Sequence, residues 1–199
     1  MAQDQEKFQQ YFGHLSQISR TGLLYKRLFV APLIYLCARR FGPRVMEVGF
    51  GFAAGLIGAF PRRVSGLEIN SLAVSYGKTR GLNVKAIAQD GDFPEGDGAF
   101  DVCVLDNVLE HIEAPAKTLD ECHRITGPSG GLIIIVPGER GYASDDDHKK
   151  FYGVAELKAL DARWELRQLF SMPAGFISAS LSRRIRQYCL VAVYAKRTG

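Results

Sequence analysis

The sequence lacks a hydrophobic run long enough to cross a membrane, and this lack narrows the class of protein. Its longest apolar run, residues 28–38, contains Pro32 and reaches only about half of the ~20 residues that a membrane-spanning helix requires. The first residues include Asp4 and Glu6 and do not resemble a secretion signal. We therefore expect a cytoplasmic protein without a transmembrane segment.

Cysteine is scarce, and so is any surplus of one charge. Cys37, Cys103, Cys122 and Cys189 lie far apart and show no C-x-x-C spacing, which favours a reduced protein without a structural metal. The net charge of +4 is spread over short Arg and Lys pairs and does not form a stripe. Such a distribution is typical of a solvated surface, so we expect a small-molecule substrate and no nucleic acid.

What remains is the composition of an ordinary globular domain. A chain of 199 residues is long enough to bury about 70% of its unfolded surface in one core. We divide it into an N-terminal helical extension, residues 1–43, and a main unit, residues 44–199, within the same domain. The extension contains apolar residues at helical spacing in residues 5–20 and 23–40. These helices either pack over a sheet or form a lid that carries Tyr11 or Tyr25 to the site.

Apolar strand patterns alternate with helical patterns through the main unit. Strands are predicted near 45–48, 63–69, 83–88, 100–106, 130–137, 164–170 and 187–196, and helices near 52–60, 71–80, 116–125 and 154–160. Alternation of this kind indicates parallel strands joined by right-handed crossovers, and the short link before the last strand indicates an antiparallel pair. The predicted fold is α/β: a Rossmann-like, seven-stranded, mostly parallel sheet with an antiparallel last strand and helices on both faces.

The first strand runs into a turn with two glycines. Gly49 and Gly51 permit a close approach of a ligand to the backbone at the start of the next helix. Glu47 precedes them, and because its carboxylate would repel phosphates, it favours an amino-acid-bearing cofactor over a pyrophosphate. Glu68 ends the second strand, where a carboxylate can accept hydrogen bonds from both ribose hydroxyls.

Polar residues also follow the third and fourth strands. Asp90 could accept a hydrogen bond from an adenine amine and the backbone of Gly91 could meet a ring nitrogen, with Asp92 as a competitor. Asp106 ends the fourth strand. The carboxyl ends of parallel strands form the edge at which open α/β sheets bind ligands, so these residues are predicted to share one site.

In this order the residues resemble the class I S-adenosylmethionine-dependent methyltransferases, in particular the compact small-molecule and quinone-type group (methyltransferase domain 11-like). The resemblance covers residues 44–199 and implies S-adenosyl-L-methionine as the cofactor. It implies contacts to the methionine moiety from Gly49, Gly51, Glu47 and the carbonyl of Asp106, to the ribose from Glu68, and to the adenine from Ile69, Asp90 and Gly91. Ala53 stands where many members have a third glycine.

Methyl transfer from a sulfonium requires mainly an aligned nucleophile and a dry site, and a general base is optional. His111 and His148 are the candidate catalytic residues, and Glu110 and the run 145–147 are further candidates for a base. For His111 a positioning role is favoured. The acidic run before His148 has no second ligand cluster in the sequence, so no metal is expected.

The expected reaction is methylation, at oxygen, of a small-molecule, lipid-precursor or glycan acceptor. One alternative is a non-catalytic S-adenosylmethionine-binding protein. Another is a nicotinamide-dependent Rossmann oxidoreductase, which also uses a glycine turn and an acidic second-strand end. Against the oxidoreductase stand the missing third glycine, the position of Glu47 and the antiparallel last strand.

Overall fold

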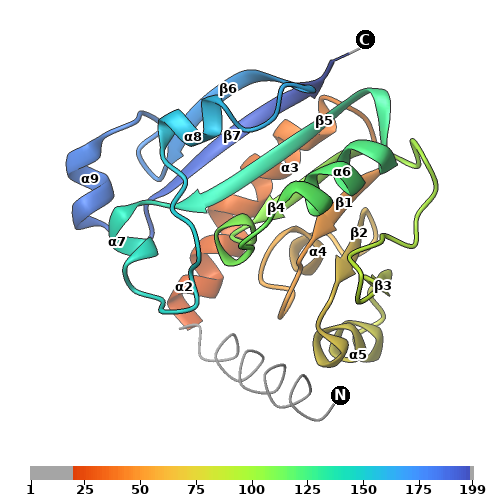
Figure 1. Cartoon of the computed structure of the whole chain (residues 1–199). Coiled ribbons are helices and arrows are strands. Elements are labelled where there is room, and N and C mark those ends of the chain that lie inside the picture. Colours follow the sequence, from red (N-terminus) through yellow and green to blue (C-terminus); the bar gives the residue numbers. More distant parts are fainter. Residues whose placement is uncertain (1–19, 198–199) are drawn as a thin grey trace.

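The computed structural model describes residues 20–197, and residues 5–19 of the first predicted helix, Tyr11 included, lie outside them. A sheet of seven strands lies between two layers of helices (Figure 1). The strand order is β3-β2-β1-β4-β5-β7-β6, and β7 runs antiparallel to both of its neighbours. The other neighbouring strands pair in parallel. The predicted fold class is therefore confirmed.

The strands coincide closely with the predicted apolar segments. They are β1 (Val45–Val48), β2 (Val64–Glu68), β3 (Val84–Ala86), β4 (Phe100–Asp106), β5 (Thr126–Pro137), β6 (Trp164–Met172) and β7 (Cys189–Lys196). The central strand β4 pairs with β1 and β5, so that Val104 lies opposite Glu47 on one side and Ile133 on the other. Since parallel strands point their carboxyl ends to one edge, Glu47 and Asp106 approach that edge from neighbouring strands.

The helices follow the same alternation. They are α2 (Arg20–Tyr25), a π-helical turn η1 (Lys26–Val30), α3 (Ala31–Arg39), α4 (Leu56–Ala59), α5 (Ser71–Thr79), a 3₁₀ turn η2 (Leu109–His111), α6 (Ala116–Ile125), α7 (Glu139–Tyr142), α8 (Val154–Lys158) and α9 (Ala179–Arg184). The segment predicted as one helix over residues 23–40 is continuous but contains the π-helical turn. None of the helices within residues 20–197 is both long and apolar enough to span a membrane.

Alternate residues of each central strand enter two separate cores. Val104 and Ile133 pack on the face covered by α3, whose Ile34 and Ala38 are buried. The residues that alternate with these along each strand point to the opposite face, which α6 and α8 cover (Figure 1). This is the pattern of a sheet buried on both sides. The helical extension thus packs on the sheet through α3, one of the two arrangements expected for it.

One predicted helix start is wrong, and another is confirmed. The helix predicted over 52–60 begins only at Leu56, because Ala53 has a left-handed φ of 55° and the chain turns before it becomes helical. The predicted start of α5 at Ser71 is confirmed. Asn70 caps this helix, since its Oδ1 accepts hydrogen bonds from the backbone N–H groups of Leu72 and Ala73.

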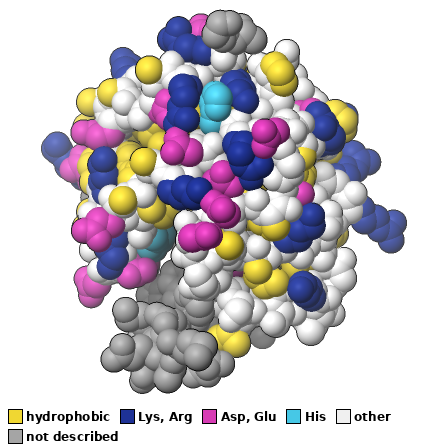
Figure 2. Space-filling view, turned by 45° about the vertical axis from the view of Figure 1, so that its right-hand side comes forward, with side chains coloured by type: hydrophobic (Ala, Val, Ile, Leu, Met, Phe, Trp, Pro, Cys, Tyr) yellow, Lys and Arg dark blue, Asp and Glu magenta, His cyan; other side chains and the backbone are white. Residues whose placement is uncertain are grey.

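On the face drawn in Figure 2, charged side chains do not separate by sign. Figure 2 shows basic and acidic side chains interspersed over one face. Ion pairs account for part of this pattern, for example Arg124 with Asp97 and Arg163 with Asp120. The mixed charge agrees with the even distribution along the sequence.

Candidate active site

A cavity of about 470 Å³ opens at the carboxyl edge of the sheet. Residues at or just beyond the carboxyl ends of β1, β4, β5 and β6 line it, together with the first residue of β7: Gly49, Asp106, Pro137, Met172 and Cys189. Gly22, Tyr25 and Lys26 reach it from the helical extension. The extension therefore both packs on the sheet and borders the cavity, and Tyr25 lies where the lid hypothesis expected it.

A second, wider hollow of about 710 Å³ lies at the opposite edge. Its lining includes Pro43, Val64 and Asn83, which lie just before or at the amino ends of β1, β2 and β3. Ligands of open α/β sheets bind outside the carboxyl ends of the strands, where helix N-termini point at them. We therefore take the smaller cavity as the candidate active site.

The glycine turn forms one wall of this cavity. Gly49 and Gly51 have φ angles of 72° and 49°, in the left-handed region that glycine tolerates best. A Cβ atom at Gly49 would lie 2.6 Å from Cγ2 of Val108, so the turn packs tightly against the segment after β4. Gly51 donates its N–H to Oε2 of Glu68 at 2.8 Å. The glycine turn thereby connects the carboxyl ends of β1, β2 and β4.

Glu47 lies behind the turn with both carboxylate oxygens engaged. They accept hydrogen bonds from the backbone N–H groups of Leu56 at 3.0 Å and Ile57 at 2.7 Å, at the first turn of α4. The side chain is buried yet borders the cavity. Burial raises the pKa of Glu47 to about 7, with a further contribution from Asp106, although the two backbone hydrogen bonds oppose the shift. Each oxygen keeps a second lone pair for a ligand.

Lys26 is a site residue that the sequence interpretation missed. Its ammonium group lies 3.1 and 3.2 Å from the two carboxylate oxygens of Asp106. Burial lowers the pKa of Lys26, but the Asp106 carboxylate and other negative neighbours outweigh burial, so the pKa is raised. The available signal was a lysine, followed by Arg27, in a mostly apolar helical segment. That signal does not say which partner the lysine meets.

The residues predicted to hold ribose and adenine lie along the same edge, outside the cavity lining. Glu68 is buried and accepts N–H groups from Gly51, Ile69 and Asn70. Burial raises the pKa of Glu68, and its backbone hydrogen bonds oppose this. Ile69 and Asp90 are exposed, and Gly91 is partly buried.

Asp90 and Asp92 differ in the groups that they bind. Asp92 forms an ion pair with Lys117 of α6, whereas Asp90 accepts a hydrogen bond from the backbone of Asp92 at 3.2 Å. Gly91 has a φ of 87° and a Cβ there would lie 3.1 Å from the Lys117 side chain. The loop is therefore fixed by Asp92, which leaves Asp90 and Gly91 as the predicted adenine contacts.

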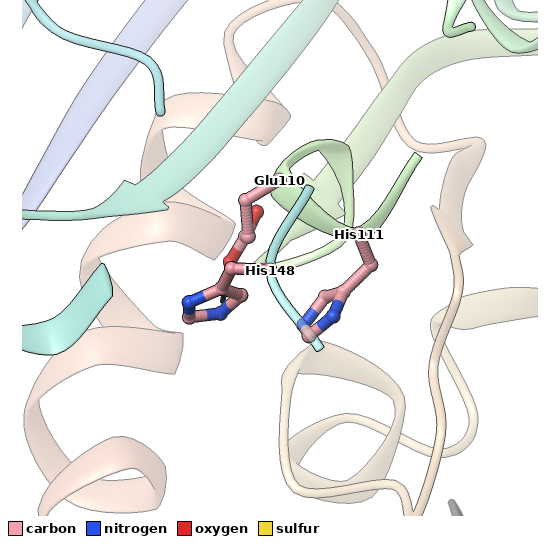
Figure 3. A group of neighbouring side chains, drawn as sticks. All are labelled: Glu110, His111 and His148. Carbon is pink, nitrogen blue, oxygen red and sulfur yellow. Dashed lines mark ion pairs between the residues drawn. The ribbon is translucent and has the colours of Figure 1, made fainter. Parts of the chain in front are cut away.

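Glu110, His111 and His148 meet at the cavity wall (Figure 3). Glu110 and His111 come from η2, and His148 comes from the loop after α7. That loop is held in place because the backbone N–H of Lys149 donates to the carbonyl of Glu110 at 2.7 Å. The two predicted catalytic histidines, 37 positions apart in the sequence, thus have ring centroids only 4.6 Å apart.

Glu110 is the most buried member of this group. Its carboxylate oxygens have no hydrogen-bond partner among the described residues. Burial raises the pKa of Glu110 to about 8, with a smaller contribution from Asp106. Burial also lowers the pKa of His111, and His148 lowers it further.

Comparison with known proteins finds similar sequences and similar folds. Residues 46–134 match the family described as Methyltransferase domain. A Mycolicibacterium smegmatis protein named "Probable S-adenosylmethionine-dependent methyltransferase" is 29% identical over 150 residues, covering 71% of this chain and 55% of that protein. The match covers 43% of the length of a Mycobacterium tuberculosis relative. The chain thus spans about half the length of the curated relatives it matches.

Solved structures share the fold over nearly the whole chain. A SAM-dependent methyltransferase from Aquifex aeolicus has a TM-score of 0.65 at 18% identity, with 94% of this chain and 97% of that chain covered. A SAM-dependent methyltransferase from Thermotoga maritima, named as a possible histamine N-methyltransferase, has a TM-score of 0.68 at 17% identity, with 94% and 98% covered. At these identities the likeness shows the fold alone.

Gly49→Ala tests whether the turn requires glycine for space as well as for its dihedral. Gly81→Ala is the matched control, because Gly81 has a φ of 70° and a Cβ there meets nothing within 4 Å. Both variants carry the left-handed strain, while only the first overpacks against Val108. We expect Gly49→Ala to lower the free energy of unfolding by roughly 1–3 kcal/mol more than Gly81→Ala, measured by urea denaturation. Equal losses would contradict the tight packing.

Glu47→Gln tests the burial of the Glu47 carboxylate through pH. Because the folded pKa of about 7 exceeds the ordinary value of 4.5, Glu47 stabilises the fold fully below pH 4.5 and loses this contribution as pH rises through 7. The free energy of unfolding of the native chain, minus that of Glu47→Gln, should fall by roughly 2–3 kcal/mol between about pH 5 and pH 8. Urea denaturation at each pH measures it. A pH-independent difference would contradict the raised pKa.

Proposed function

We propose that this chain is a class I S-adenosylmethionine-dependent methyltransferase that uses S-adenosyl-L-methionine as cofactor and methylates an oxygen of a small-molecule, lipid-precursor or glycan acceptor. The cofactor supplies a methyl group already activated on a sulfonium. The protein's own residues then have to bind the cofactor, align the acceptor and exclude water.

The observation that carries the proposal is the charge pattern at the glycine turn. Glu47 and Asp106 bring two carboxylates and Lys26 brings one ammonium to the same wall of the cavity. The methionine end of the cofactor bears an ammonium and a carboxylate. We assign its ammonium to Glu47 and Asp106 and its carboxylate to Lys26, which would exchange part of its bond to Asp106 for this contact.

The rest of the cofactor is assigned to the neighbouring edge of the sheet. Glu68 keeps lone-pair capacity beyond the three backbone hydrogen bonds it accepts, since a carboxylate has about four acceptor sites. It is assigned to the ribose. Ile69 is exposed and available to pack on the adenine, with Asp90 and Gly91 at the adenine rim. Gly49 and Gly51 let the backbone run close to the cofactor between these two ends.

The acceptor is assigned to the side of the cavity that holds the histidines. His111 and His148 lie there, and His148 is held by a hydrogen bond of 2.7 Å between its Nδ1 and the carbonyl of Tyr142. The hydroxyl of Tyr25 is buried and has no hydrogen-bond partner among residues 20–197. A polar ligand would satisfy it, and α2 would then close the cavity against water. The mixed surface charge supports a small acceptor over nucleic acid.

Binding and transfer together test the proposed function. Isothermal titration should detect S-adenosylhomocysteine and no nicotinamide dinucleotide. Labelled methyl should then move from S-adenosylmethionine to one fraction of the host's metabolites, and the product should resist hydrolysis as an ether does. Binding of the dinucleotide alone would refute the methyltransferase assignment. Binding of S-adenosylhomocysteine without transfer to any fraction would leave a cofactor-binding protein and refute the enzyme.

Lys26→Met tests the assignment of the cofactor carboxylate. Loss of the charged partner should weaken S-adenosylhomocysteine binding by about 1.5–3 kcal/mol, or roughly 10- to 150-fold, as measured by titration. Arg27→Met is the control, because Arg27 is the next residue but is exposed and does not line the cavity. An equal dissociation constant for the native chain and Lys26→Met would place the carboxylate elsewhere.

A further inference from the structure

The cluster of Glu110, His111 and His148 has the composition of a metal centre. We propose that these three side chains bind one divalent first-row transition ion, for which Zn²⁺ is the probe. One ligand atom from each residue lies within 4.8 Å of the others. Two imidazoles and one carboxylate are the donor set of many catalytic zinc sites and of the two-histidine, one-carboxylate iron sites. The sequence alone predicted no metal, because it could not place Glu110 and His111 beside His148.

The separations are slightly wider than those of a filled site. Nε2 of His148 lies 3.9 Å from Oε1 of Glu110. Ligand bonds of about 2.1 Å in tetrahedral geometry hold donor atoms roughly 3.4 Å apart. Side-chain rotations that move each ligand atom by about 1 Å would bring the three atoms to the separations of a filled site. The present separation is also too long for a hydrogen bond between the two residues.

The second nitrogen of His148 is hydrogen-bonded in the way that metal ligands require, and one nitrogen of His111 faces a carboxylate. His148 Nδ1 lies 2.7 Å from the carbonyl oxygen of Tyr142, which makes Nδ1 the protonated nitrogen and leaves the lone pair of Nε2 facing Glu110. Nδ1 of His111 lies 3.3 Å from a carboxylate oxygen of Asp147. Metal-binding histidines commonly donate their other N–H to a carbonyl or a carboxylate, which fixes the ring.

The burial of Glu110 is a second and independent indication. Its side chain is 1% exposed, and neither oxygen has a hydrogen-bond partner within the described part of the chain. In its charged form, a buried carboxylate without hydrogen bonds is costly unless a cation compensates it. Lys26 is bonded to Asp106 and forms no hydrogen bond with the Glu110 oxygens. An ion between Glu110 and the two histidines would satisfy the carboxylate.

Three protein ligands leave at least one coordination position open to the cavity. If the proposed function holds, on which this step rests, the acceptor oxygen occupies that position. A bound hydroxyl loses its proton to solvent more easily, because the ion stabilises the oxyanion. The oxygen then attacks the methyl carbon, an O–C bond forms, the S–C bond breaks, and sulfur keeps the electron pair. Acceptors with a hydroxyl beside a second oxygen donor would chelate the ion and are the preferred class.

Metal binding can be tested without any methyl acceptor. The full chain is freed of metal with a chelator, and Zn²⁺ is titrated in competition with a chromophoric indicator. We expect one equivalent to bind. His148→Gln should weaken binding more than about 100-fold, beyond the 10- to 100-fold range of an outer-shell change, which Asp147→Asn should show. His123→Gln is the control, because His123, on α6, packs against Trp164 of β6 and is not part of the cluster.

Three outcomes separate this proposal from the proposed function. Binding of S-adenosylhomocysteine that persists in His148→Gln shows an intact fold, so that loss of zinc in this variant supports the site. Equal zinc affinity in the native chain and His148→Gln overturns the proposal even if methyl transfer occurs. Co²⁺ gives a second measurement, since its visible d–d bands should appear with the native chain and His123→Gln. Their absence from the native chain also overturns it.

Discussion

The buried carboxylate of Glu47 is the interaction on which the site depends. It lies at the end of β1 and accepts the first backbone N–H groups of α4, so that one side chain joins strand, turn and helix. The favourable field of a helix N-terminus partly offsets the burial of its charge. A Cβ atom at Gly55 would lie 2.1 Å from its Oε1, so position 55 has no room for a side chain. The late start of α4 and the open backbone at Gly49 and Gly51 follow from this arrangement.

Charge compensation then organises the cavity around that carboxylate. Asp106 adds a second negative group on the neighbouring strand, and Lys26 from the helical extension neutralises it. The extension thus supplies the positive charge that pairs with Asp106. A zwitterionic ligand can exchange with this internal ion pair at little electrostatic cost, because each of its charges meets an existing partner. Both the packing of α3 and the proposed cofactor contacts depend on the same segment.

Another part of the cavity wall is formed by two segments that only the fold joins. The turn after β4 carries Glu110 and His111, and the loop after α7 carries His148 and Asp147. The backbone hydrogen bond from Lys149 to Glu110 holds them together. The two described walls therefore differ in kind. One is built on glycines, helix N-termini and fixed charges, and the other on two histidines and Glu110, whose carboxylate has no hydrogen-bond partner within residues 20–197.

The local pattern of the sequence determined the helices and strands, and it determined which residues form the cavity wall at the glycine turn. Apolar periodicity decides strand and helix, and the order of Glu47, Gly49, Gly51 and Glu68 along β1 and β2 places them on one edge, because parallel strands share the direction of their carboxyl ends. Boundaries such as the start of α4 depended on single dihedrals. Tertiary structure alone decided that Lys26 meets Asp106 and that His148 meets Glu110 and His111. Those contacts join segments 80 and about 37 positions apart, and no local pattern encodes which side chains meet when separate elements pack.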